Sequence, residues 1–327
     1  MVTVLKPRHH TGERRPALGV PVVPEPAGKP RRVGREPLSS FDGCPGGVAV
    51  DANQMVYLSE IDSAAIWRAS LDGTGEAVAG PHAGNDRLYS PAGIALAPDG
   101  SLVVADATAH RVCAVGMDGS IRVVAGGVSG YRDGPAGQAT FRFPRAVAVG
   151  ADGTIFVADT GNDRIRQISP DGQVSTLAGS GFDYGDGRGE HGRFRRPSGL
   201  ALDAAGVLYV ADTGNNAIRR VTPHGDVTTV AGSPPGGDQD SVGRLGLRWP
   251  AAVSVDDGGR LWVADFGNAK IRVIDPTGDT FTVLEIPGLS WPAAVATLPG
   301  RRAVVAGSSL DDRLGRHGWL MVIDDDH

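Results

Sequence analysis

Five arginines stand at the start of apolar stretches, where they could together bind an anion. Arg142, Arg195 and Arg248 each precede a proline by two positions, and Arg145 and Arg196 lie beside the same prolines. A guanidinium group binds a carboxylate or a phosphate through two parallel hydrogen bonds. The pattern therefore predicts an anion cradle, provided that the fold brings these residues together.

The same arginines have an alternative, structural role. Ion pairs with acidic residues on the same face of the protein would satisfy both partners. Such acidic residues end an apolar stretch at Glu60, Asp106, Asp159, Asp212 and Asp265. Both roles can coexist if only some of the arginines are paired. Three further arginines, Arg164, Arg219 and Arg272, lie within apolar stretches and are expected to be structural.

Catalysis would need a base whose pKa lies near the working pH, or a metal ion that supplies one. His191 is the best candidate for the base, because it lies in a polar loop with Asp186, and Glu60 could assist. A single histidine in a loop is more often only solvated, which is the alternative interpretation. No cofactor is identified and the metal is left open, since backbone carbonyls lining a channel can hold Ca²⁺ without leaving a sequence motif.

Aromatic residues accompany the arginines. Trp249 and Trp291 directly precede prolines, and Tyr89 and His110 belong to the same set of loops and turns. Aromatic side chains of this kind can form the floor of a binding pocket, with a polar group at one end. Alternatively, the two tryptophans plug the top of the core. We include all four as candidate ligand-binding residues.

A repeated unit must position these residues. Each copy runs from a proline-led apolar stretch through a turn and a second apolar stretch to an acidic turn and two further short stretches. The six copies begin at Pro45, Pro91, Pro144, Pro197, Pro250 and Pro292. The stretches are rich in Val and Ile and bounded by Asp-Gly or Gly-Asn, which are strand and hairpin signals. Each copy is therefore expected to be a four-stranded antiparallel sheet.

Six such sheets predict an all-β fold, a six-bladed β-propeller. A single four-stranded sheet cannot bury both of its faces, and radial stacking around an axis solves this problem. The last copy lacks a fourth strand, so the ring is expected to be closed by an N-terminal strand, for which Val20 to Val23 and Arg31 to Gly34 are candidates. We assign residues 1–36 to an N-terminal extension that contributes this strand, and residues 37–327 to the propeller.

Loop length distinguishes the two ends of the predicted ring. Turns between the first and second strands, and between the third and fourth, are minimal. The connections from one copy to the next span eleven residues from Gly80 to Pro91 and eighteen before each of the following three prolines. Long loops in a compact domain are commonly functional. The site is therefore expected on the face that carries these loops, around the mouth of the central channel.

Composition and charge narrow the partners. The chain has a net charge of −5, and residues before Pro37 carry eight Lys and Arg against three Asp and Glu. The acidic remainder argues against nucleic acid, whose phosphates need a basic surface. No apolar stretch approaches the length that spans a membrane, and Cys44 and Cys113 match no metal or redox spacing. A cytoplasmic protein without a membrane partner is the expectation.

The third and fourth copies, VADTGNDRIRQISPDGQVSTLAG and LYVADTGNNAIRRVTPHGDVTTVAG, resemble NHL repeats, which build β-propellers. The first copy, YLSEIDSAAIWRASLDGTG, resembles propellers of the gluconolactonase and YWTD kinds, and the sixth lacks the acidic turn. Gluconolactonase-like propellers hold a divalent cation with acidic residues of their inner strands, amidating lyases of the NHL kind use zinc-binding histidines, and streptogramin lyases use a histidine and a glutamate. The first strands here, such as GGVAV and AVAV, contain no acid. The resemblance therefore implies the fold but carries over none of these active sites.

Two functions follow from these features. The favoured one is a propeller that binds an anionic small molecule or peptide on the long-loop face. The alternative is a stand-alone hydrolase or lyase that acts on a small molecule in the axial pocket.

Overall fold

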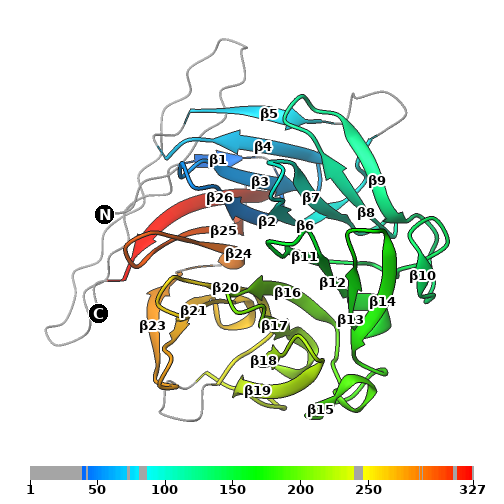
Figure 1. The fold of residues 1–327 in the computed structure, drawn as a ribbon. Helices are drawn as coiled ribbons and strands as arrows, with labels where there is room; N and C mark the ends of the chain where they lie inside the picture. Colours follow the sequence, from blue (N-terminus) through cyan, green and yellow to red (C-terminus); the bar gives the residue numbers. More distant parts are fainter. Residues whose placement is uncertain are drawn as a thin grey trace, which may run out of the picture.

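The computed structural model describes residues 39–41, 43–71, 74–80, 87–238, 246–286, 288, 290–311 and 315–325. Within these ranges the chain forms six antiparallel sheets arranged as blades around a central axis (Figure 1). The only helical elements described are single 3-10 turns. The predicted all-β, six-bladed propeller is therefore confirmed. No helix in the described ranges has the length and apolar character needed to cross a membrane.

Each blade begins with the strand nearest the axis and proceeds outward along the chain. The strands are β2 (Pro45–Val50), β3 (Val56–Glu60), β4 (Ala65–Ala69) and β5 (Gly75–Ala79) in blade 1; β6 (Pro91–Leu96), β7 (Leu102–Asp106), β8 (Arg111–Val115) and β9 (Ile121–Gly126) in blade 2; β11 (Ala146–Val149), β12 (Ile155–Asp159), β13 (Arg164–Ile168) and β14 (Gln173–Ala178) in blade 3; β16 (Pro197–Leu202), β17 (Leu208–Asp212), β18 (Ala217–Val221) and β19 (Asp226–Gly232) in blade 4; β20 (Pro250–Val255), β21 (Leu261–Asp265), β22 (Lys270–Ile274) and β23 (Thr280–Glu285) in blade 5; and β24 (Ser290–Leu298), β25 (Arg302–Asp311) and β26 (Gly315–Asp324) in blade 6.

An N-terminal strand closes the ring. β1 (Ser39–Phe41) pairs antiparallel with β26 and supplies the fourth strand of blade 6. N-terminal closure is thus confirmed, and the pairing strand follows both stretches considered from the sequence. Those stretches, Val20 to Val23 and Arg31 to Gly34, lie outside the described residues. The division of the chain at residues 36 and 37 stays a prediction.

Apolar residues between neighbouring blades form the core. Six apolar clusters are present, and each joins two adjacent blades. Trp262 is fully buried between blades 5 and 6, and Tyr57 is buried between blades 1 and 2. Large side chains of the second strand therefore fill the space between blades. Each sheet packs against a neighbouring blade on both of its faces.

Small residues allow the inner strands to approach one another near the axis. The backbone N–H of Gly93 in β6 donates a 2.7 Å hydrogen bond to the carbonyl of Arg145 in the next blade. A Cβ atom at Gly93 would lie 2.7 Å from that oxygen, and one at Gly199 would lie 2.7 Å from the Cα atom of Ala252. Only glycine fits such contacts. The ring is therefore narrow where the first strands begin.

A buried aspartate ends the second strand in blades 2 to 5, and in blades 3 to 5 it binds the same three kinds of partner. In blade 4, Asp212 Oδ1 accepts the backbone N–H of Arg195 at 2.8 Å. Its Oδ2 accepts hydrogen bonds from Asn215 Nδ2 and Arg219 Nη1, both at 2.8 Å. The equivalent groups are Asp159, Asn162 and Arg166 in blade 3, and Asp265, Asn268 and Arg272 in blade 5. The carboxylate thus joins three parts of one blade.

The buried arginine also holds the long loop that precedes its blade. Arg219 is fully buried and donates to Asp186 Oδ1 and to the carbonyl of Gly185, both at 2.7 Å. Asp186 also accepts the hydroxyl of Thr229 in β19. In blade 3, Arg166 reaches Asp133 of the preceding loop in the same way. These contacts explain how loops of this length remain ordered.

The middle parts of two long loops extend their blades outward. β10 (Gly134–Pro135) pairs with β14, and β15 (Gly187–Arg188) pairs with β19. Both short strands lie at the outer perimeter of the ring (Figure 1). Each loop therefore runs to the outside of the following blade and returns towards the axis only at its end.

Blade 6 has a different residue at the aspartate position. Gly307 pairs with Pro292, as Asp212 pairs with Pro197 in blade 4. A Cβ atom at Gly307 would collide with the indole ring of Trp319 and with the carbonyl of Trp291. Trp319 is buried beside this glycine. An aromatic ring therefore occupies the space that the charged network fills in blades 3 to 5.

Candidate functional site

The residue directly before the first proline of the repeat has a strained backbone in three blades. Phe143, Arg196 and Trp249 have φ angles of 48°, 52° and 49°, in the left-handed region that side chains disfavour. A side chain from the preceding blade accepts each backbone N–H. The acceptors are His110 Nδ1 at 3.1 Å, Asp163 Oδ1 at 2.6 Å and Asn216 Oδ1 at 2.8 Å, respectively. Neighbouring blades thus fix these residues where the long loops return to the axis. We call this end of the ring the loop face.

Arg145 and Arg196 come from adjacent blades and both lie on the loop face. Both side chains are exposed, and neither forms an ion pair with a carboxylate of the described residues. The surrounding inner strands partly dehydrate the Arg145 guanidinium group, which lowers its pKa, and the positive charge of Arg196 lowers that pKa further. The guanidinium groups of these two arginines have no carboxylate partner among the described residues, although Asp163 accepts the backbone N–H of Arg196.

Arg142, Arg195 and Arg248 occupy equivalent positions in blades 3 to 5. Their backbone N–H groups donate to the buried aspartates, and their side chains are exposed. Each stem passes over a glycine of the turn after the second strand; a Cβ atom at Gly214 would lie 2.6 Å from Arg195 Cγ. The guanidinium group of Arg195 stacks on Phe182, 4.3 Å from the ring centroid.

The carboxylates pair with other arginines. Asp159, Asp212 and Asp265 bind Arg166, Arg219 and Arg272, which belong to the third strand of the same blade. Within the described ranges, none of the five loop-face arginines takes part in these pairs. Arg219 and Arg272 are fully buried, as their structural role predicts. Arg164 instead stacks on Tyr131, 4.1 Å from the ring centroid.

Burial changes the protonation of the central carboxylates. Burial raises the pKa of Asp212 to about 6. The hydrogen bonds from its partners and the positive charge of Arg219 lower this pKa, but burial has the larger effect. Burial raises the pKa values of Asp159 and Asp265 for the same reason. These groups are engaged in the blade and do not face solvent. Their shifts therefore belong to stability and do not indicate a catalytic acid.

The three residues considered for catalysis lie in separate surroundings. His191 is exposed in the 3-10 turn η2 (Gly189–His191), next to β15 at the outer edge of blade 4. The carboxylate of Asp186 is engaged by Arg219 and Thr229. Glu60 is buried in blade 1, where Oε2 accepts hydrogen bonds from Ser63 and Trp67. The fold does not bring these three side chains together.

The aromatic candidates divide into exposed and packed groups. Trp249 is 57% exposed and Tyr89 is 53% exposed, so both rings are accessible on the loop face. Trp291 stacks on Phe266 with ring centroids 6.1 Å apart. His110 packs edge-on against Phe143, with centroids 4.6 Å apart. The exposed rings can contact a ligand, whereas the packed ones also support the joints between blades.

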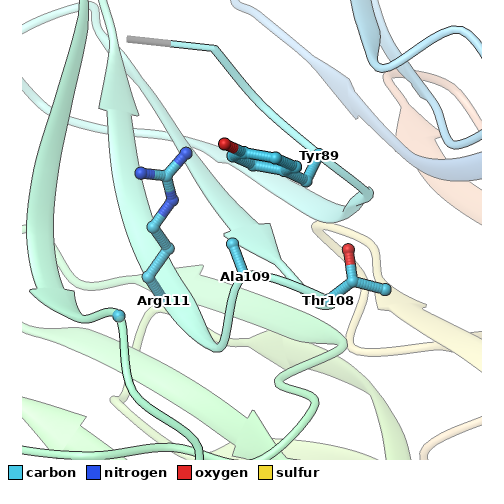
Figure 2. Close-up of a pocket in the computed structure, with 5 residues that line it drawn as sticks. Tyr89, Thr108, Ala109 and Arg111 are labelled. Atoms are coloured by element: carbon cyan, nitrogen blue, oxygen red, sulfur yellow. The ribbon is translucent and has the colours of Figure 1, made fainter. Parts of the chain in front are cut away.

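Two cavities lie at different places in the ring. One, of about 290 Å³, is axial and is lined by the last residues of the six first strands, including Val149, Ser254 and Thr297. Because these strands begin at the loop face, this cavity lies towards the opposite end of the channel. The other, of about 300 Å³, lies beside Tyr89 and Arg111 in blade 2 (Figure 2). The loop-face arginines therefore stand on the surface and outside the axial cavity.

The described residues contain no group of three or more His, Cys, Asp or Glu side chains that could hold a metal ion.

Comparison with known proteins identifies the repeat. The family model of the NHL repeat matches residues 88–114, 141–168, 194–220 and 247–274, which span the first three strands of blades 2 to 5. The protein is an NHL-repeat β-propeller. Blades 1 and 6 of this NHL propeller lie outside the matched residues, and they are the blades whose aspartate position differs.

Several curated proteins resemble part of this NHL propeller. Teneurin-3 of Danio rerio is 30% identical over 215 residues, which are 54% of this chain and 8% of Teneurin-3. The chloroplastic protein SUPPRESSOR OF QUENCHING 1 of Arabidopsis thaliana is 30% identical over 194 residues, 52% of this chain and 18% of that protein. NHL repeat-containing protein 2 of Homo sapiens is 34% identical over 130 residues, 36% of this chain and 18% of the relative. The chain thus spans less than a fifth of the length of each of these three relatives.

Solved structures share the fold. A gluconolactonase from Xanthomonas campestris has a TM-score of 0.62 and 18% identity, covering 86% of both chains. A virginiamycin B lyase from Staphylococcus aureus has a TM-score of 0.55 and 18% identity, covering 86% of this chain and 87% of the lyase. At this level of identity the likeness concerns the fold alone.

Sequence reasoning missed Arg166 and Asp133. Arg166 stands 53 positions before Arg219 and 106 before Arg272, so the repeat length was sufficient to identify it. Asp133 and Asp186 are likewise 53 positions apart and bind equivalent arginines. The periodicity could therefore have identified these residues as a set. That the arginine of the third strand binds the aspartate of the preceding loop is visible only in the structure.

Proposed function

We propose that the protein is a binding propeller that recognises an anionic group of a small molecule or peptide on its loop face, around the central channel. One observation carries this proposal. Arg145 and Arg196, from adjacent blades, are both accessible on the loop face, their guanidinium groups have no carboxylate partner among the described residues, and the charge of Arg196 lowers the pKa of Arg145. Two neighbouring positive charges repel each other, and an anion between them relieves that repulsion.

The contrast with the buried arginines supports the proposal. Arg166, Arg219 and Arg272 have carboxylate and carbonyl partners, so their role is accounted for by the fold. The guanidinium groups of the five loop-face arginines take no part in these ion pairs within the described residues. Exposed Trp249 and Phe143 stand on the same face, and aromatic residues with arginine are the composition found at energetic centres of interfaces.

The enzyme alternative has weaker support. A hydrolase or lyase needs a base held next to its partner groups, and His191, Asp186 and Glu60 lie in separate surroundings. The lyase and gluconolactonase structures support the shared fold and no more. Binding without catalysis is therefore the function that we propose.

Isothermal titration calorimetry tests the proposed site with three probes: inorganic phosphate, succinate and an acidic peptide. We expect at least one probe to bind saturably, and the double variant Arg145→Ala with Arg196→Ala to weaken it at least tenfold, since each charged hydrogen bond contributes about 1.5–3 kcal/mol. Binding should also weaken as salt increases. The control is Arg122→Ala, an exposed arginine on the outer strand β9. If none of the three probes binds, or if the double variant binds like the control, the proposal is wrong.

A further inference from the structure

The turn after the second strand of blade 2 differs from its equivalents at one decisive residue. Ala109 stands where blades 3 to 5 carry Asn162, Asn215 and Asn268. The amide of each asparagine donates to the buried aspartate at 2.8 Å and to a carbonyl of the preceding loop at 2.7–2.8 Å. Alanine has no side-chain donor. Blade 2 therefore lacks the amide that ties the turn to the segment before it.

A pocket opens where this amide would stand. It has a volume of about 300 Å³ and is lined by Tyr89, Thr108, Ala109, Arg111 and Gly127. Figure 2 shows the Arg111 guanidinium group beside the Tyr89 ring, with Ala109 and Thr108 of the turn nearby. This volume is at the low end of the range of about 300–1,000 Å³ for small-molecule sites. The occupant must be compact.

The pocket walls combine positive charge with an aromatic face. The guanidinium carbons of Arg87 and Arg111 lie 4.7 Å and 5.6 Å from the Tyr89 ring centroid. Arg111 Nε donates to Asp106 at 2.9 Å and Nη2 to the carbonyl of Arg87, whereas Nη1 has no partner among the described residues. The Thr108 hydroxyl likewise has none there, and it lies on an exposed residue.

The pocket lining contains no carboxylate. The nearest one, Asp106, is fully buried behind it and accepts the N–H groups of Tyr89 and Ser90 as well as Arg111. Arg111 is paired with Asp106, so the surplus positive charge beside the pocket is that of Arg87, which has no ion pair among the described residues. An anion is favoured there, and a cation is disfavoured.

We propose that this pocket binds a compact aromatic carboxylate. Its carboxylate would accept hydrogen bonds from Arg111 Nη1 and the Thr108 hydroxyl, and its ring would pack against Tyr89. An inorganic anion would use the donors but leave the aromatic face empty. The inference goes beyond the proposed function, because none of the lining residues belongs to the arginine pair at the axis.

Calorimetry with benzoate tests this pocket, and cyclohexanecarboxylate serves as the non-planar comparison. We expect benzoate to bind one site saturably and cyclohexanecarboxylate to bind at least threefold more weakly. Ala109→Asn should weaken benzoate at least tenfold, because it restores the amide of blades 3 to 5 and places it in the space that the ligand would occupy. Tyr89→Leu, which removes the ring without removing an ion pair, should weaken benzoate by a similar factor.

The double variant Arg145→Ala with Arg196→Ala separates this inference from the proposed function. Its benzoate affinity should equal that of the wild type, even if its binding of phosphate, succinate or acidic peptide is lost. Three results would overturn the inference: no saturable benzoate binding, unchanged affinity in Ala109→Asn, or loss of benzoate binding in the arginine double variant. Thermal unfolding of each variant verifies that it is folded before titration.

Discussion

Blades 4 and 6 are both antiparallel sheets, but they carry charged residues and an aromatic residue, respectively, at the equivalent position. In blade 4, a buried aspartate, an asparagine and a buried arginine meet at the end of the second strand. In blade 6, Gly307 and Trp319 occupy that position. A charged network is therefore not needed to form a blade. What differs is the segment before the blade: Arg219 holds a long loop through Asp186, whereas only a few residues separate β23 from β24. The network is retained where a long loop must be anchored.

The largest expected effect comes from breaking the charged network of blade 4. Arg219→Met leaves Asp212 buried without its ionic partner and releases Asp186. Removing one member of a buried ion pair costs about 3–5 kcal/mol of unfolding free energy. Denaturant unfolding measures this loss, and hydrogen exchange should show reduced protection in residues 181–194.

A neighbouring arginine provides the control for this experiment. Arg220 lies next to Arg219 in β18 but is only partly buried. Arg220→Met should therefore change the unfolding free energy by less than about 1 kcal/mol. Equal losses in the two variants would show that the network neither stabilises blade 4 nor anchors its loop.

A steric change in blade 6 should have the next largest effect. Gly307→Ala introduces a methyl group against the Trp319 ring and the Trp291 carbonyl. Overpacking of this kind costs about 1–3 kcal/mol. Gly137→Ala is the matched control, because a Cβ atom at Gly137 has no neighbour within 4 Å. If both variants unfold at the same denaturant concentration, packing of the tryptophan on glycine is not what stabilises this position.

The pH dependence of stability should distinguish the two blades more finely. Burial raises the pKa of Asp212 to about 6, above its ordinary value of 3.8. A carboxyl group that holds its proton more tightly when folded stabilises the protein most at low pH, and this contribution is lost as pH rises from about 4 to about 6. At about 1.4 kcal/mol per pKa unit, the contribution is on the order of 3 kcal/mol at most. Gly307 contributes no such dependence.

Unfolding of the wild type and Asp212→Asn between pH 4 and pH 7 measures this contribution. The wild type should exceed the variant in unfolding free energy by a margin that shrinks as pH rises. A margin that stays constant, or grows with pH, would show that the ion pair with Arg219 outweighs the burial of Asp212.

Most of the fold could be predicted from the sequence because recurring residues mark the boundaries of each repeat. The prolines before the first strands and the Asp-Gly turns mark the strands, and the 53-residue spacing establishes radial repetition. The partner of β26 was harder to predict, since β1 is only three residues long and has no repeat around it. Short edge strands are specified by their partner more than by their own residues.

The site was less predictable than the fold. The sequence indicated that Arg145 and Arg196 come from adjacent blades, and in the structure the charge of Arg196 lowers the pKa of Arg145. It did not indicate that Asp186 is taken by Arg219, or that the middle of the loop with His191 lies at the outer edge of blade 4. Loop path depends on contacts between residues distant in sequence, such as Thr229 with Asp186. The pocket beside Tyr89 follows from a missing amide, which only comparison with the other blades makes visible.

The pairing of β1 with β26 has a consequence for how the chain folds. Ser39 pairs in register with Leu320, so two segments from opposite ends of the described chain must meet in one sheet. Five blades consist of strands that are local in sequence, but this final contact has a very high sequence separation, and such contacts form late and slowly. An open ring with an unpaired β26 edge is therefore the expected last intermediate, and it is the species most exposed to intermolecular strand pairing and aggregation.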